Sequence, residues 1–394
     1  MIWNMIRFLS VILFVLLTCH SVLFLSWINF FNIQTYKAKL TLFLILSFLS
    51  VTFILSSILI HLFNNTLTRN YYLLSGFWMG LLTFLLMGTV LIWVIKGVLW
   101  CLPINIPMDI FIRNSSLIFY SIAFVYAGFC HYQFYKIELR SIHVKILNLP
   151  EQWKGKRIIH LSDLHLGGAK HIEFLKKVVS LTNQQNADLI MITGDLFDGA
   201  TNFQKRYMSL IETLEAKDGV IFTSGNHEIY SGIDTTRKLI EDSKVILLDN
   251  KAIVLDGLQI LGISYPEFKN SFSFDFNDPK IFTKGLPTIL LYHTPTNIKG
   301  AGQNLTKIQS KDYLAPDTAF FYARELGISL QLSGHTHAGQ FLPYTWVTKK
   351  IFKGFHYGLH KIDDFYINIS TGAGSWGPPL RSGYLSEIVI ITLE

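Results

Sequence analysis

The chain has 394 residues, of which 50% are hydrophobic and 15% are charged, and its formal net charge is +7. Soluble domains average about 25% charged residues, so this composition argues against a disordered chain and against a purely soluble enzyme. Residues 1–135 contain six basic residues and one acid, so +5 of the charge lies there and +2 in residues 136–394. We therefore expect two domains, 1–135 and 136–394, and the second is large enough to bury its own core.

The first part contains four stretches without Asp, Glu, Lys or Arg, each 22 residues or longer. About 20 helical residues cross a bilayer, and only helices satisfy their own backbone groups within lipid. A signal peptide would explain only the first stretch, and a soluble bundle would need polar helix faces, which these stretches lack. The pattern predicts a four-helix transmembrane anchor, with spans at Phe8–Phe31, Leu40–Leu62, Tyr71–Ile95 and Asn114–Tyr135.

The orientation of the anchor depends on the basic residues near the spans. Four spans put the N-terminus and the second domain on the same side, where five basic residues lie near the spans, against four on the other side. In this multi-pass membrane protein, the small difference in basic residues favours the cytoplasmic side for the catalytic domain. His20, His61 and His131 lie in or at the ends of the spans, but no acid accompanies them within the membrane, so we expect an anchor rather than a transporter.

From Lys136 onward, short apolar runs alternate with amphipathic segments. Apolar residues at helical spacing predict one helix around 172–179 and another from Phe203 to Leu214. Runs rich in β-formers lie between them, and the segments 244–264 and 365–393 consist mainly of predicted strands and turns. The second part is therefore predicted to be an α/β domain.

Five of the predicted strands run directly into polar side chains with metal-binding or acid–base chemistry. Ligands of open α/β sheets bind at the carboxyl ends of strands, where short loops hold side chains rigidly. These five sites are Asp163 and His165; Asp195 and Asp198; Asn226, His227 and Glu228; His293; and His335 and His337.

Carboxylate, amide and imidazole groups are donors for Mn, Fe or Zn rather than for metals that prefer thiolates. So many donors exceed the need of one ion, and a shared carboxylate would hold two ions about 3.5–4 Å apart. Such a pair activates water and stabilises both oxygens of an in-line phosphoryl displacement. Glycines precede Asp195, Asn226 and His335, which lets the backbone turn sharply there.

The motifs of residues 155–394 resemble those of the calcineurin-like metallophosphoesterase superfamily, in the family's order. The motifs are Asp163-x-His165, Gly194-Asp195-x-x-Asp198-Gly199, Gly225-Asn226-His227-Glu228, His293 and Gly334-His335-Thr336-His337. The segment Trp376-Gly377-Pro378-Pro379-x-Arg381 is similar to the membrane-anchored bacterial branch, which includes phosphodiesterases and UDP-diacylglucosamine hydrolase-like enzymes.

The resemblance implies a four-layer αββα sandwich with a site for two divalent metal ions, preferably Mn, with Fe or Zn as alternatives. It implies that Asp195 bridges the ions, that His227 is the general acid that protonates the leaving oxygen, and that Asp198 orients His227. One ion would be held by Asp163, His165, Asp195 and His337, and the other by Asp195, Asn226, His293 and His335.

The motifs do not assign a role to several residues near them. Glu228 and Ala338 depart from the residues that many relatives have, and they bear on substrate shape more than on chemistry. Arg381 is expected to be an exposed loop residue rather than a phosphate ligand, and Trp376 either covers the cleft or belongs to a plain turn. The 41 residues between His293 and His335 contain the aromatic run 320–322, which forms either a lid or a helix with a packed face.

The predicted activity is that of a metal-dependent phosphoesterase, a hydrolase of phosphoric ester bonds. The domain begins within a few residues of the fourth span, so a membrane-borne substrate would be presented at high effective concentration. We expect metal-activated hydroxide to attack a phosphodiester or pyrophosphate bond, in a substrate that is lipid-linked.

Three alternatives remain. A nuclease or nucleotide phosphodiesterase shares this metal chemistry, but a +2 domain without a dense basic stripe suits a polyanion poorly, so no specific nucleic-acid partner is expected. A binding module that has lost catalysis would need a broken motif. A transporter or sensor with a regulatory phosphoesterase-like domain would need functional groups within the spans.

Overall fold

The computed structural model describes residues 2–63, 65–103, 106–198, 204–266, 276, 278, 282–298 and 314–394. The chain divides into two compact units. The helical unit consists of Met1–Gln133 and Gly377–Leu380, and the α/β unit consists of Phe134–Trp376 and Arg381–Glu394.

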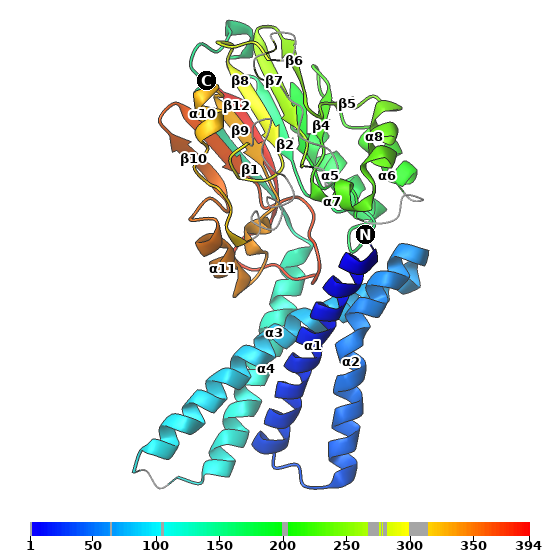
Figure 1. Ribbon diagram of the computed structural model, residues 1–394, viewed down its shortest axis with the longest axis vertical. Helices are drawn as coiled ribbons and strands as arrows, with labels where there is room; N and C mark the ends of the chain where they lie inside the picture. Colours follow the sequence, from blue (N-terminus) through cyan, green and yellow to red (C-terminus); the bar gives the residue numbers. More distant parts are fainter. Residues whose placement is uncertain are drawn as a thin grey trace. The chain divides into compact units, whose positions relative to one another are not determined.

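Four long helices make up most of the helical unit (Figure 1). Each is long and apolar enough to cross a membrane, which agrees with the four predicted spans. The helices extend beyond the uncharged stretches, and Asn65 caps the start of the third by accepting a hydrogen bond from the Thr68 backbone N. They are α1 (Ile2–Phe30), α2 (Tyr36–Phe63), α3 (Thr66–Cys101) and α4 (Met108–Phe134).

Two histidines of the helical unit are engaged in hydrogen bonds. The indole Nε1 of Trp78 on α3 donates to His20 Nε2 on α1 at 3.0 Å. His131 Nδ1 lies 2.9 Å from the carbonyl oxygen of Pro379, which belongs to the same unit. Both contacts fit a packing role for these histidines, as expected of an anchor.

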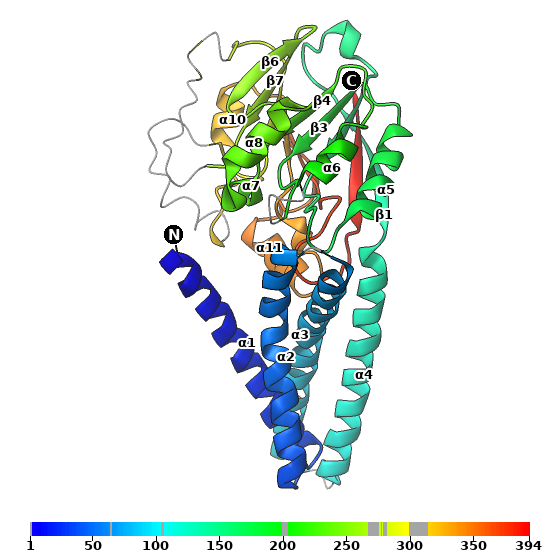
Figure 2. The same ribbon diagram turned by 90° about the vertical axis from the view of Figure 1, so that its right-hand side faces the viewer.

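The α/β unit contains two six-stranded mixed sheets (Figure 2). In the first sheet, the spatial order is β1 (Ile137–Val144), β12 (Ser386–Leu393), β2 (Arg157–Leu161), β3 (Leu189–Thr193), β4 (Val220–Thr223) and β5 (Ile246–Leu247). In the second, it is β10 (Gly358–Ile362), β11 (Phe365–Ile369), β9 (Leu330–Ser333), β8 (Thr288–Tyr292), β7 (Leu258–Ile263) and β6 (Lys251–Leu255).

Alternating side chains of the strands build three separate cores, because successive residues of a strand point to opposite faces. On β3, Leu189 and Met191 face the second sheet, whereas Ile190 and Ile192 face helices. Those helices are α5 (Ile172–Asn183), α6 (Gln204–Ile211) and α8 (Ile233–Glu241). The outer face of the second sheet packs against α10 (Phe321–Glu325), so the unit has the predicted αββα layers.

The strands that precede the predicted site are neighbours within their sheets. β2, β3 and β4 pair in parallel in the first sheet, and β8 pairs in parallel with β9 in the second. All five strands occur where the sequence predicted them. The α5 prediction is also confirmed; of the second predicted helix, Phe203 lies outside the described residues and α6 covers Gln204–Ile211.

Candidate metal centre

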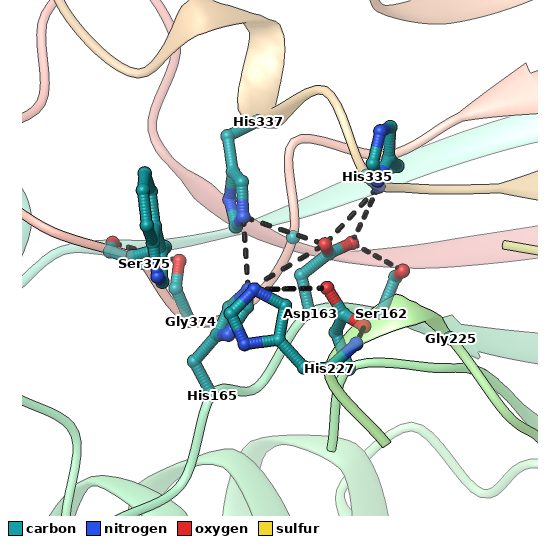
Figure 3. Close-up of polar contacts among 12 residues, drawn as sticks. Ser162, Asp163, His165, Gly225, His227, His335, His337, Gly374 and Ser375 are labelled. Carbon is teal, nitrogen blue, oxygen red and sulfur yellow. Dashed lines mark hydrogen bonds and ion pairs between the residues drawn. The ribbon is translucent and has the colours of Figure 1, made fainter. Parts of the chain in front are cut away.

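The loops after the five strands bring the predicted site residues together. Figure 3 shows Asp163, His165, His227, His335 and His337 of this set. Asp163 and His165 follow β2, and Asp195 follows β3. Asn226 begins the short helix α7 (Asn226–Ser231) after β4, His293 follows β8, and His335 and His337 follow β9. Their side chains meet because both sheets direct the carboxyl ends of these strands to the same edge of the unit.

Five of the seven predicted ligands have a left-handed backbone. The φ angles of Asp163, His165, Asp195, His335 and His337 lie between 46° and 70°. Only a few per cent of residues other than glycine adopt this conformation, and such strain concentrates at functional sites. The loops are therefore shaped to aim side chains inward rather than to connect elements by the easiest path.

One group of donors consists of Asp163, His165 and His337. His165 Nε2 lies 3.0 Å from His337 Nε2, and His337 Nε2 lies 3.4 Å from Asp163 Oδ1. A second group joins Asp163 to Asp195 and His293, with His293 Nε2 3.2 Å from Asp195 Oδ2. Asp195 Oδ2 also lies 3.7 Å from His165 Nε2, so Asp195 lies next to donors of both groups.

Asn226 and His335 complete the cluster. His335 Nδ1 lies 2.9 Å from Asn226 Oδ1, and the His335 backbone N donates to both carboxylate oxygens of Asp163 at 3.1 Å. His293 Nδ1 donates to the Thr193 carbonyl at 2.7 Å, so Nε2 is the ring nitrogen that faces the carboxylates.

The donor set fits a pair of divalent ions. His165 Nδ1, His293 Nε2 and His337 Nδ1 are buried and have no hydrogen-bonding partner among the described residues. Of these three nitrogens, His293 Nε2 lies beside the carboxylates, 3.2 Å from Asp195 Oδ2, whereas His165 and His337 turn Nε2 toward them. Buried polar atoms are normally satisfied, so an unpartnered imidazole nitrogen beside two carboxylates is the pattern expected of a metal ligand. The histidine and aspartate clusters are consistent with a binuclear metal site.

The electrostatics of the cluster agree with the geometry. Burial lowers the pKa of His335 and of His337 to about 3, so both imidazoles are neutral at pH 7 and keep a lone pair. Burial alone would also lower the pKa of His293, but the carboxylates of Asp195 and Asp163 raise it to about 9. The two carboxylates thus create a potential that attracts positive charge.

His227 lies beside the cluster and is held by two acids. Its Nδ1 donates to Asp198 Oδ1 at 2.9 Å, and its backbone N donates to Asp195 Oδ1 at 2.9 Å. Burial would lower the pKa of His227, but Asp195 and then Asp198 raise it to about 10. The imidazole is therefore protonated at pH 7 and oriented as a proton donor would be.

The glycines before the motif residues allow close approach of neighbouring loops. A Cβ on Gly334 would lie 2.0 Å from both Asp163 Oδ2 and Ser162 Oγ, and a Cβ on Gly225 would lie 2.3 Å from Asp195 Oδ1. Gly194 has φ of +82°. The sharp turn expected of these glycines is seen at Gly194, whereas Gly225 and Gly334 allow a close approach of the backbone to a carboxylate. Gly199, which ends the second motif, lies outside the described residues.

Glu228 has a structural role that the sequence analysis missed. Its buried carboxylate accepts hydrogen bonds from the backbone N of Asp195, Leu196 and Gly225, at 2.8–2.9 Å, and of Phe197 at 3.3 Å. It therefore ties the loop after β3 to the start of α7 and does not lie at the substrate surface. The available signal was the glutamate three residues after Gly225, a spacing from which a side chain reaches back to the backbone N of the residue that begins a helix.

Arg381 is not the exposed loop residue that the sequence predicted. Its side chain is fully buried, and its guanidinium donates to the carbonyls of Thr371, Gly374 and Leu385. Its charge is dispersed over backbone oxygens instead of meeting a phosphate. In the aromatic run 320–322, Phe320 is buried and packs between Phe355 and Phe365, which supports the helix interpretation at that position.

Comparisons with known proteins point to one family. The family model of the calcineurin-like phosphoesterases matches residues 156–339. An uncharacterized metallophosphoesterase of Campylobacter jejuni is 31% identical to this chain over 287 residues, which cover 72% of this chain and 70% of that protein.

Two further relatives are more distant. An uncharacterized metallophosphoesterase of Helicobacter pylori is 29% identical over 245 residues, covering 61% of this chain and 60% of that protein. A transmembrane protein with metallophosphoesterase domain from Danio rerio is 28% identical over 271 residues, covering 64% of this chain and 56% of that protein. The chain thus spans less than two thirds of the length of these two relatives.

Proposed function

The chain belongs to the calcineurin-like metallophosphoesterase superfamily, and we propose that it is a membrane-anchored hydrolase that cleaves a phosphodiester or pyrophosphate bond. We take residues 1–135 as the anchor and 136–394 as the catalytic domain. The proposal is carried by one observation: two carboxylates, one amide and four imidazoles converge after five strands, and the buried His293 Nε2 among them has no hydrogen-bonding partner in the described residues.

Asp195 would be the ligand that the two ions share. Bound ions would act as Lewis acids that activate water and neutralise charge on the phosphate oxygens. Manganese is our first choice because the donors mix carboxylate, amide and imidazole, with iron or zinc as alternatives. Asp163, His165, Asp195 and His337 would hold one ion, and Asp195, Asn226, His293 and His335 the other.

His227 would act as the general acid. Its Nδ1–H is engaged by Asp198, so the proton available for transfer is on Nε2, which lies 4.0 Å from Asp195 Oδ2 and therefore faces the cluster. From that atom the imidazole would protonate the oxygen of the departing alcohol. Asp198 would keep the ring in this orientation and stabilise its charged form.

A lipid-linked substrate is the class we propose, with the catalytic domain on the cytoplasmic side. The four apolar helices support a lipid-linked substrate because they would keep the domain at a membrane surface, where an embedded substrate is concentrated.

The test uses the full chain, purified in detergent and reconstituted with Mn²⁺, Fe²⁺ or Zn²⁺. We expect hydrolysis of phosphodiesters and of a lipid-linked pyrophosphate in mixed micelles, little hydrolysis of phosphomonoesters or DNA, and loss of activity with a chelator. Activity that survives complete removal of metal, or that is confined to monoesters, would contradict the proposal.

A further inference from the structure

Two aromatic side chains flank His227 and remain half exposed. The ring centroid of Trp376 lies 6.2 Å from that of His227, and the ring centroid of Tyr230 lies 6.0 Å from it. Trp376 is 54% exposed and Tyr230 is 49% exposed. The planes of Trp376 and Tyr230 make angles of 75° and 51° with the imidazole plane, so neither ring is stacked on His227.

The backbone that carries Trp376 is firmly held. The Trp376 backbone N donates to Gln340 Oε1 at 3.2 Å. The buried guanidinium of Arg381 donates hydrogen bonds to the two residues just before Trp376, to the Gly374 carbonyl at 2.6 Å and to the Ser375 hydroxyl at 3.2 Å. The exposed indole is therefore presented by a fixed loop, and ordering it on binding would cost little entropy.

Tyr230 is positioned by the helix that carries the general acid. His227 and Tyr230 are three residues apart on α7, so they share one face of that helix. The hydrogen bonds that Glu228 accepts anchor the start of α7 to the loop after β3. The position of Tyr230 relative to His227 is thus fixed by one helical turn.

We propose that Trp376 and Tyr230 bind a flat aromatic ring in the leaving group of the substrate, beside His227. The inference rests on the proposed function, in which His227 protonates the leaving oxygen, because side chains around the general acid then face the leaving group and not the part that remains on phosphorus. Two half-exposed aromatic side chains favour an aromatic partner, since offset or edge contacts between rings add to the burial of apolar area. The substrate class is therefore a phosphodiester whose leaving alcohol bears a ring, such as a nucleoside.

The test compares two substrates that differ only in the flatness of the ring. Methyl 2-phenylethyl phosphate and methyl 2-cyclohexylethyl phosphate release alcohols of similar size and acidity, and release of each ring-bearing alcohol is followed by chromatography with the manganese-loaded full chain in detergent. We expect kcat/KM to be about tenfold higher for the phenyl ester. Trp376→Leu and Tyr230→Leu should each reduce this ratio, and the double variant should bring it close to one.

Two variants serve as controls. Trp376→Phe keeps an aromatic ring and should retain most of the preference. Trp346→Leu removes another exposed tryptophan, on α11 (Tyr344–Ile351), and should leave the ratio unchanged. Full metal content in every variant shows that the fold and the metal centre are intact.

The outcomes separate this inference from the proposed function. If the wild-type chain hydrolyses both esters equally, or if the double variant keeps the full preference, the aromatic subsite is refuted while the phosphodiesterase proposal stands. If the fully metal-loaded chain hydrolyses neither these nor any other phosphodiester or pyrophosphate, both proposals fail together.

Discussion

Asp195 is the residue on which the contacts of the site converge. Its Oδ1 accepts a hydrogen bond from the His227 backbone, and its Oδ2 lies 3.2 Å from His293 Nε2 and 3.7 Å from His165 Nε2. The Asp195 carboxylate thus lies next to the imidazoles of both His293 and His165, which we assign to different ions. Its charge should therefore be required for the binding of both ions.

Replacing Asp195 by Asn should therefore empty the whole centre. We expect Asp195→Asn to bind at most one ion weakly, because the shared negative charge is lost while the side-chain volume is kept, and elemental analysis after desalting measures this. Asp188→Asn, which changes a buried acid just before the opposite end of β3, should keep its metal. Two ions per chain in Asp195→Asn would rule out the bridging role.

The role of His227 can be separated from metal binding by the choice of leaving group. His227→Ala should lower kcat by roughly 10²- to 10⁴-fold for alkyl phosphodiesters, which need protonation of the leaving oxygen, and far less for 4-nitrophenyl esters. Metal content should stay full. His143→Ala, a change of an exposed histidine, is the control. Equal losses with both ester types would argue against general-acid catalysis.

Among the elements, the turn after β3 and the start of α7 depend on each other through Glu228. Glu228→Ala would leave four buried backbone N–H groups without their acceptor. We expect the free energy of unfolding to fall by about 3 kcal/mol or more, because each unsatisfied buried donor costs about 1–3 kcal/mol. Glu228→Gln keeps an acceptor oxygen and should lose less.

Denaturant unfolding in detergent measures the free energy of unfolding of Glu228→Ala and of a control variant. Glu241→Ala, at an exposed position at the end of α8, should change stability by less than about 0.5 kcal/mol. A Glu228→Ala protein as stable as Glu241→Ala would mean that the tie between the two loops contributes nothing.

The segment between β2 and α5 contains a buried lysine. Lys170 Nζ donates to the Phe134 carbonyl at 2.9 Å and lies over the Phe134 ring. Burial, together with the charge of Arg381, holds the pKa of Lys170 well below its usual value. The unfolded chain binds the proton up to a pH of about 10.4. Between the two pKa values it therefore holds more protons than the folded chain, and stability falls as pH falls through this window.

Lys170→Met should remove this contribution. We expect the stability of wild type relative to Lys170→Met to rise as pH increases towards 10, measured as thermal midpoints in detergent at a series of pH values. Lys177→Met is the matched control, because the exposed Lys177 also donates to a backbone carbonyl, that of Tyr135. If the difference in thermal midpoint between wild type and Lys170→Met does not vary with pH, the pKa of Lys170 is not lowered in the folded chain.

For the molecule as a whole, membrane sidedness can be read from cysteine labelling. All three cysteines lie before residue 135, and Cys101 is exposed at the end of α3, whereas Cys130 is buried. The connection between α3 and α4 must lie opposite the catalytic domain if both helices span the membrane. With a cytoplasmic domain, an impermeant maleimide should label Cys101 in intact cells, and Cys101→Ser should abolish the signal. Labelling only after permeabilisation would reverse the orientation.

The sequence by itself determined the elements and the chemistry of the candidate site. Apolar length predicts the four helices, because a bilayer demands it of any spanning segment. The positions of Asp163, Asp195 and His293 after apolar strands predict where the donors meet, because parallel strands end at one edge. These signals are local in the chain or follow from sheet topology.

Only the tertiary structure decided what the supporting residues do. Arg381 looked like a surface residue, since a sequence does not show that its own loop will fold so that the carbonyls of Thr371, Gly374 and Leu385 surround the guanidinium. Glu228 looked like a variant position until the loop after β3 folded over it. Trp376 was placed beside His227 by contacts between loops nearly 150 residues apart. Such contacts depend on how several loops pack at once, and a pattern read along one strand or helix carries no record of that packing.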